Sequence, residues 1–134
     1  FSGNDGLPLD RRGALDMIGK LAAAGDIQAG NDLAWYLCTG PDAALRDPNR
    51  GIATIIPVVK DYPIAAFQDT QAGCLAATGD FAQATDVEQR AIANAPVEAV
   101  GMLAGMRERL ALYRKKQPYV EDPSKTAIAP PMPA

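Results

Sequence analysis

Residues 69–96, DTQAGCLAATGDFAQATDVEQRAIANAP, contain the signals for two helices and for the turn between them. Ala72 and Leu75 lie on one face at helical spacing, and Gly79 ends that run. Asp80 follows as the N-cap of a second helix, with Gln83 three residues later as in a capping box. This segment therefore predicts a helix, a tight turn and another helix.

The second helix of this unit has an apolar stripe at helical spacing, which predicts that one of its faces is buried. The stripe consists of Phe81, Ala84, Val87, Ala91 and Ile92. Small residues occur in both helices, and Ala72 and Ala84 would let two antiparallel helices approach closely. We expect a compact helical hairpin that ends at Pro96.

The order of these features is similar to the tetratricopeptide repeat, a helical hairpin of about 34 residues. Further motifs between Asn31 and Tyr119 resemble a bacterial subfamily of such repeats. They are NDLAWYL at 31–37, PD at 41–42, LRD at 45–47, DT at 69–70, GDF at 79–81, RLALYR at 109–114 and QPY at 117–119. The chain is identified on these motifs as similar to that subfamily.

The resemblance implies an all-α fold, a right-handed stack of antiparallel helical hairpins with about two repeats. The helical pattern of residues 9–24 is interpreted as the second half of an incomplete repeat. The pattern that can start at Pro96 and runs to Tyr113 is interpreted as a C-terminal capping helix. We expect one helical domain over residues 1–119 and a Pro-rich, extended tail over residues 120–134.

One segment conflicts locally with this fold. Residues 51–59, GIATIIPVV, are mostly β-branched and would favour a strand in isolation. Gly51, Val58 and Pro63 have the same spacing as Ala84, Ala91 and Pro96 in the next repeat. This alignment predicts a helix over residues 51–59.

Composition argues against several classes of function. The net charge of −3 is unsuited to nucleic-acid binding, and no apolar segment is long enough to span a membrane. The absence of histidine excludes Ser–His and Cys–His pairs, and no phosphate-binding or metal-binding motif occurs. A carboxylate pair such as Asp69 with Glu88 is interpreted as helix caps and surface charges. The sequence therefore predicts no enzyme activity, no cofactor and no metal.

The resemblance also bears on the two cysteines. In stacked hairpins of this family the first helices of successive repeats run side by side, which would turn Cys38 and Cys74 toward each other. A disulfide would favour a periplasmic or other extracytoplasmic location. The alternative is a pair of buried thiols in a cytoplasmic protein.

The predicted function is a non-catalytic protein–protein interaction module. By position in the family, the contact residues of its concave face for a peptide or protein partner are Asn31, Trp35, Asp69 and Gly73. The alternatives are a regulatory or assembly domain of a larger enzyme, and a structural domain that self-associates into a homo-oligomer.

Overall fold

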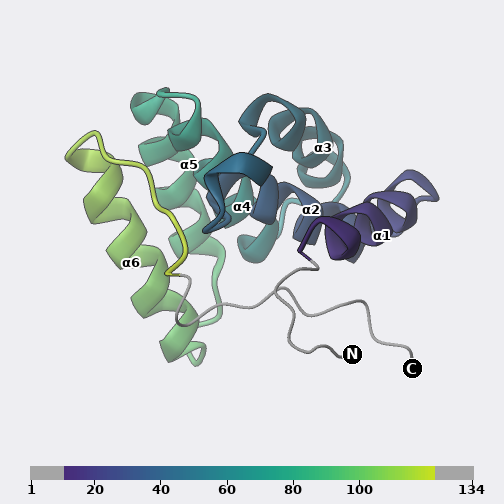
Figure 1. Cartoon of the computed structure of the whole chain (residues 1–134). Helices are drawn as coiled ribbons and strands as arrows, with labels where there is room; N and C mark the ends of the chain where they lie inside the picture. The colour runs from purple at the N-terminus through teal and green to yellow at the C-terminus, as the bar shows by residue number, and fades with distance from the viewer. Residues whose placement is uncertain (1–10, 123–134) are drawn as a thin grey trace.

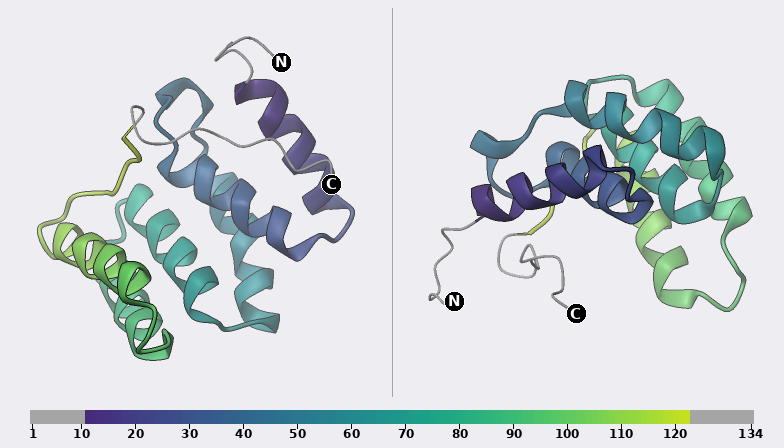
Figure 2. Two further views of the ribbon diagram at one scale, coloured as in Figure 1. Left: turned by 90° about the horizontal axis from the view of Figure 1, so that it is seen from below. Right: turned by 90° about the vertical axis from the view of Figure 1, so that its right-hand side faces the viewer.

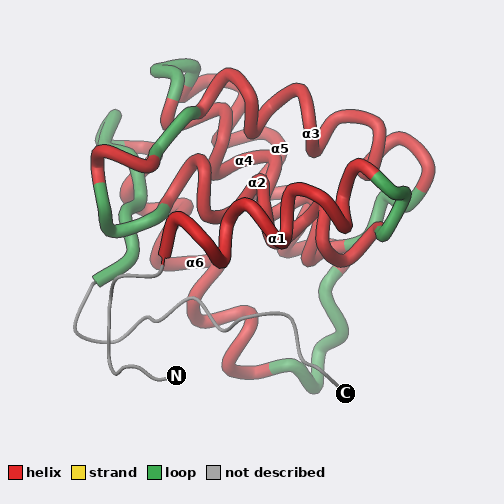
Figure 3. The backbone as a smooth tube through the Cα atoms, turned by 45° about the vertical axis from the view of Figure 1, so that its right-hand side comes forward, coloured by secondary structure: helices red, strands yellow, loops and turns green. Residues whose placement is uncertain are grey.

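Between residues 11 and 122, the computed structural model contains six α-helices, one short 3-10 helix and no strand. They are α1 (Arg11–Ala23), α2 (Ile27–Thr39), η2 (Ala43–Leu45), α3 (Pro48–Asp61), α4 (Ala65–Ala77), α5 (Phe81–Asn94) and α6 (Val100–Arg114). Figure 1 labels the α-helices, and Figure 3 shows loops in the remainder of the described chain. The predicted all-α fold is confirmed for these residues. The structure describes residues 11–122, so most of the predicted tail lies outside it.

Successive helices pack against each other along the chain. α2 packs on α3 and α4 packs on α5, so that each pair forms a helical hairpin, while α1 packs on α2 and α6 packs on α5. α2 also contacts α4, and α4 contacts α6, which places these three helices next to one another. We call their shared surface the α2–α4–α6 face. Figure 2 shows the helices following one another from α1 at one end to α6 at the other.

The α4–α5 hairpin has the turn that its sequence predicts. Gly79 adopts a positive φ of 90°, a conformation that glycine reaches without steric cost. The Asp80 carboxylate accepts hydrogen bonds from the backbone N–H of Gln83 (3.1 Å) and from its side-chain amide (2.8 Å). The predicted helix stop and N-cap are both confirmed.

The β-branched segment 51–59 is helical, as the repeat alignment predicts, and lies within α3. Ile55 is completely buried and Val58 is almost so, both in a cluster with Phe67 of α4. Each buried branched side chain contributes about 1.5–3 kcal/mol, more than the few tenths by which such residues disfavour a helix. Tertiary packing therefore overrides local propensity here.

α6 begins at Val100, four residues after the predicted start at Pro96. The Ala99 N–H donates to the Pro96 carbonyl (3.0 Å), and the Val100 N–H donates to the backbone carbonyl of Glu98 (2.8 Å). These bonds form a tight turn that reverses the chain before the helix starts, which the apolar stripe alone does not indicate.

The two cysteines are joined in a disulfide that links α2 to α4, with Cα atoms 4.9 Å apart. Both residues are almost completely buried. Gly51 of α3 lies directly against the bridge, and a Cβ atom placed there would overlap Cys38 Sγ. The predicted pairing of Cys38 with Cys74 is confirmed in the structure.

The alanines of the α4–α5 hairpin fill its interface. Ala72 and Ala84 are both 0% exposed and belong to one packed cluster. We expect Ala72→Leu to lower the free energy of unfolding by about 1–3 kcal/mol, because the larger side chain overpacks the crossing. Thermal melts measure the effect, with Ala82→Leu at an exposed position of α5 as the control. Equal melting temperatures for the two variants would contradict this packing.

Candidate binding site on the α2–α4–α6 face

A hollow of about 240 Å³ opens on the α2–α4–α6 face. Residues of all three helices line it. Those of α2 and α4 contribute its polar side chains, and those of α6 are two methionines. Its principal lining residues are Asn31, Asp32, Trp35, Asp69, Met102 and Met106. Side chains from three separate helices thus meet around one opening.

Three of the four predicted contact residues line this hollow: Asn31, Trp35 and Asp69. Gly73 is not among its lining residues. A Cβ at Gly73 would lie 3.3 Å from the Thr39 methyl group and 3.5 Å from the Trp35 ring. Gly73 therefore leaves room for the Trp35 ring beside the hollow.

Asp69, which lines the hollow, forms an ion pair with Arg109 of α6. Arg109 Nε lies 2.9 Å from Asp69 Oδ1, and Nη2 lies 2.9 Å from Oδ2. The two side chains are only 12–13% exposed. This two-point geometry joins α4 to α6 and orients the guanidinium more firmly than a single contact would.

Two aromatic rings lie beside the same guanidinium. Arg109 Cζ is 5.3 Å from the centroid of the half-buried Trp35 and 5.2 Å from that of Tyr119. The two ring centroids are 5.9 Å apart. At these distances a guanidinium is attracted by the faces of the rings. Arg109 and Tyr119 are missing from the predicted site, although both belong to the motifs RLALYR and QPY.

Glu88 of α5 is completely buried beside this ion pair. Burial, and then the negative charge of Asp69, raise the pKa of Glu88 to about 10. When ionised, its carboxylate has no hydrogen-bond partner in residues 11–122. When protonated, it can donate a hydrogen bond to Asp69.

The interpretation of Asp69 and Glu88 as caps and surface charges is therefore wrong. Counted over the whole residue, Asp69 is 8% exposed and Glu88 is 0% exposed. Neither carboxyl group caps a helix. Tyr113 lies in the same buried region, and burial followed by the charge of Glu88 raises the pKa of its hydroxyl well above the usual value. The helix stack, rather than local sequence, brings these polar groups together.

The segment after α6 covers part of the α2–α4–α6 face. The Glu121 N–H donates a hydrogen bond to the Thr39 carbonyl at the end of α2 (2.8 Å). Figure 1 shows this yellow segment running back from the end of α6. Together with the contact between the Tyr119 and Trp35 rings, this bond fastens residues 119–121 across the face, whereas the hollow beside Asn31 remains open.

We expect Tyr119→Ala to shift the fluorescence of Trp35, the only tryptophan, to longer wavelength. The substitution removes a ring that lies 5.9 Å from the indole and leaves that side of it to water. Emission spectra measure the shift. Tyr62→Ala is the matched control, because Tyr62 is 49% exposed at the end of α3. An unchanged spectrum for Tyr119→Ala would contradict the contact between the two rings.

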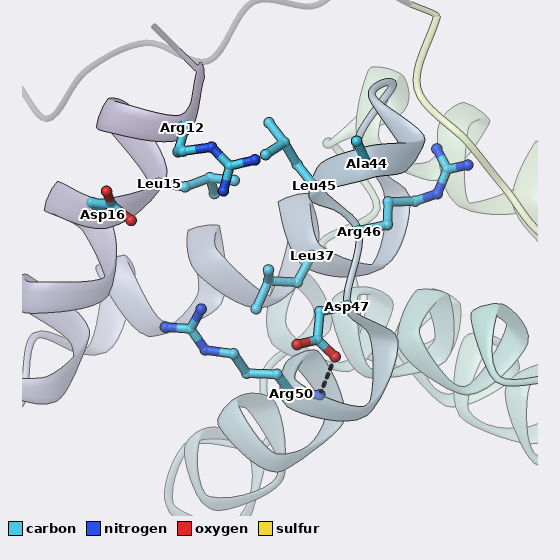
Figure 4. Close-up of a pocket in the computed structure, with 9 residues that line it drawn as sticks. All are labelled: Arg12, Leu15, Asp16, Leu37, Ala44, Leu45, Arg46, Asp47 and Arg50. Carbon is cyan, nitrogen blue, oxygen red and sulfur yellow. Dashed lines mark hydrogen bonds between the residues drawn. The ribbon is translucent and has the colours of Figure 1, made fainter.

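A second hollow, of about 230 Å³, lies between α1, η2 and the start of α3. Figure 4 shows the guanidinium groups of Arg12 and Arg50 pointing into it, while Arg46 points away. The Asp47 carboxylate accepts a hydrogen bond from the Arg50 backbone N–H (3.3 Å), and Asp16 lies at the rim. This hollow is of mixed charge and contains none of the predicted contact residues.

Metal binding finds no support in the described part of the chain. Within residues 11–122, no three side chains of the types His, Cys, Asp and Glu are placed to hold an ion.

In comparisons with known proteins, no family model, curated protein or solved structure matched this chain. None of the helices in residues 11–122 has the length and apolar content needed to cross a membrane.

Proposed function

We propose that this protein is a non-catalytic interaction module whose α2–α4–α6 face binds a peptide or a protein element of a partner. One observation carries the proposal. Asn31, Trp35 and Asp69, expected from the sequence to be contact residues, surround a single open hollow. A pocket that combines apolar walls with a few convergent polar groups is typical of a binding site.

We also propose that the helices form a tetratricopeptide-like stack, with the α2–α3 and α4–α5 hairpins as two repeats. α1 would then be the second helix of an incomplete repeat, and α6 the cap. The order of helix contacts supports this arrangement. It is supported further by the meeting of Trp35, Asp69, Arg109 and Tyr119, because these four residues come from four motifs of the resemblance.

The disulfide supports a location outside the cytoplasm. Disulfides persist in oxidising compartments such as the bacterial periplasm and are rare where thiols are kept reduced. The bridge between Cys38 and Cys74 is buried in the core and is therefore part of the folded structure. We propose a role in the bacterial cell envelope.

Selection from a random peptide display library tests the binding function. We expect enriched peptides whose affinity falls at least about tenfold, or 1.4 kcal/mol, when Asn31→Ala alters the hollow. Asp86→Asn, at an exposed position of α5, is the control and should leave affinity unchanged. Enriched peptides that bind both variants equally would contradict the proposed site, and a library without enrichment would contradict peptide binding.

A second candidate, self-association through α1, rests on two exposed apolar side chains. Met17 is 50% exposed and Leu21 is 37% exposed on this terminal helix. A second copy packed on α1 would bury both. Light scattering distinguishes self-association from the peptide-binding function, because self-association requires a dimer that Met17→Lys dissociates.

A further inference from the structure

We infer that the hollow on the α2–α4–α6 face receives a basic side chain, a lysine or an arginine, of the bound peptide. This inference rests on the proposed function and names the chemistry of its partner. It follows from the charge of the hollow, from an unpaired acceptor in its wall, and from the apolar groups that line the remainder.

The charge of the hollow comes from two aspartates, of which one is neutralised. Asp69 is paired with Arg109 through two hydrogen bonds. Asp32 accepts a hydrogen bond from the neutral Gln28 side chain (2.9 Å) and forms no ion pair with a lysine or arginine in residues 11–122. Among the described residues, the hollow therefore has one negative charge without an ion-pair partner, which favours a cation and opposes a carboxylate or phosphate.

Asn31 contributes an acceptor without a donor. Its Oδ1 atom is buried and has no hydrogen-bond partner in the described residues. A buried acceptor of this kind is costly, and a turn of the Asn31 side chain toward the hollow would let an ammonium or guanidinium group supply the missing donor. A purely apolar ligand would leave Asn31 Oδ1 without a donor and would remove water from the Asp32 carboxylate without offering it a cation.

Apolar groups line the other side of the hollow. They are the indole of Trp35 and the thioethers of Met102, which is 40% exposed, and Met106, which is buried. Lysine and arginine have long aliphatic stems that pack along such surfaces while the charged end reaches a polar group. Methionine is well suited to this contact because its side chain is flexible and polarizable.

The protein already holds one cation in this way. The Arg109 guanidinium lies 5.3 Å from the centroid of Trp35 and pairs with the Asp69 carboxylate. The open hollow offers the same components next to that pair, with Asp32 as a carboxylate that forms no ion pair with a lysine or arginine in residues 11–122. A basic side chain from a partner would thus meet the kind of surroundings that Arg109 has within the chain.

Trp35 fluorescence tests the inference directly, because Trp35 is the only tryptophan and lines the hollow. The probes are acetylated and amidated pentapeptides, Gly-Ser-X-Ser-Gly, in which X is lysine, arginine, norleucine or glutamate. We expect a saturable change with the lysine and arginine peptides at concentrations up to about 10 mM, and at least about tenfold weaker binding of norleucine. Asp32→Asn should weaken lysine binding by about fivefold or more, whereas the control Asp86→Asn should not.

The other outcomes separate this inference from the proposed function. Equal binding of norleucine and lysine peptides, with no effect of Asp32→Asn, would overturn the cationic ligand and leave peptide binding intact. A change of Trp35 fluorescence at lower concentration with the glutamate peptide than with the lysine peptide would overturn the inference. No response of Trp35 to any probe would contradict both the cationic ligand and this hollow as a peptide site.

Discussion

Replacing both Cys38 and Cys74 by alanine is expected to lower the free energy of unfolding by about 3–4 kcal/mol. The bridge joins residues that are 36 positions apart, so it restricts a long loop in the unfolded chain. Denaturant unfolding of the native protein and of the double variant gives the difference, and the native protein with reductant should approach the variant. A difference below about 1 kcal/mol would show that the bridge contributes little to the folded state.

A second test of this bridge adds an atom next to it, at Gly51 of α3. Exchange of a helical glycine for alanine usually stabilises by about 1 kcal/mol. At Gly51 a Cβ would overlap Cys38 Sγ, and it would lie 3.2 Å from Cys74 Sγ and 3.3 Å from the Ala34 carbonyl. We therefore expect Gly51→Ala to destabilise the native protein by about 1–3 kcal/mol, as overpacking does.

The same substitution should cost less when both sulfur atoms have been removed. In the Cys38→Ala, Cys74→Ala background the two closest atoms, both sulfur, are gone, and the Ala34 carbonyl remains at 3.3 Å. Non-additivity in the double-mutant cycle measures the direct coupling between Gly51 and the bridge. Gly101→Ala, in a helical position with open space around it, is the control and should stabilise both backgrounds equally. Equal effects of Gly51→Ala in the two backgrounds would contradict the close approach of α3 to the disulfide.

The helices could be predicted from sequence because their signals are local. The cap at Asp80 and the turn at Gly79 each act within a few residues, so their pattern alone locates α5. Local signals are not sufficient to predict helix α3, because its β-branched residues favour a strand. Only the alignment with the next repeat indicates a helix. The disulfide likewise depended on a model of how the first helices are stacked.

The ion pair beside the candidate site depends on contacts that no local pattern encodes. Asp69 and Arg109 are 40 positions apart, and their two hydrogen bonds require α4 and α6 to be in one particular register. The burial of Glu88 has the same origin, because α4 and α6 bring Asp69 and Arg109 next to a side chain of α5 that would be ordinary on an exposed helix face. The motif residues Arg109 and Tyr119 were the one available signal, although the motifs do not state which residues touch.

Glu88→Gln is expected to stabilise the protein at neutral and alkaline pH, by roughly 2–4 kcal/mol near pH 8. The pKa of Glu88 is about 10 in the folded protein, against an ordinary value of 4.5. The folded state therefore keeps a proton that the unfolded state releases, and stability falls as pH rises from about 4.5 toward 10. Glutamine keeps the size of the side chain and a donor for Asp69, but it has no proton to lose.

The signature of this effect is its dependence on pH. Between about pH 5 and pH 8, the difference in unfolding free energy between Glu88→Gln and the native protein should grow by up to about 1.4 kcal/mol per pH unit. Below about pH 4 the glutamate is neutral in both states, so the difference should become small and constant. Denaturant titrations at four or five pH values measure it, with the exposed Glu98→Gln as the control. A difference independent of pH would mean that Glu88 is ionised in the folded protein, and its burial beside Asp69 would then need a cation or water as a partner.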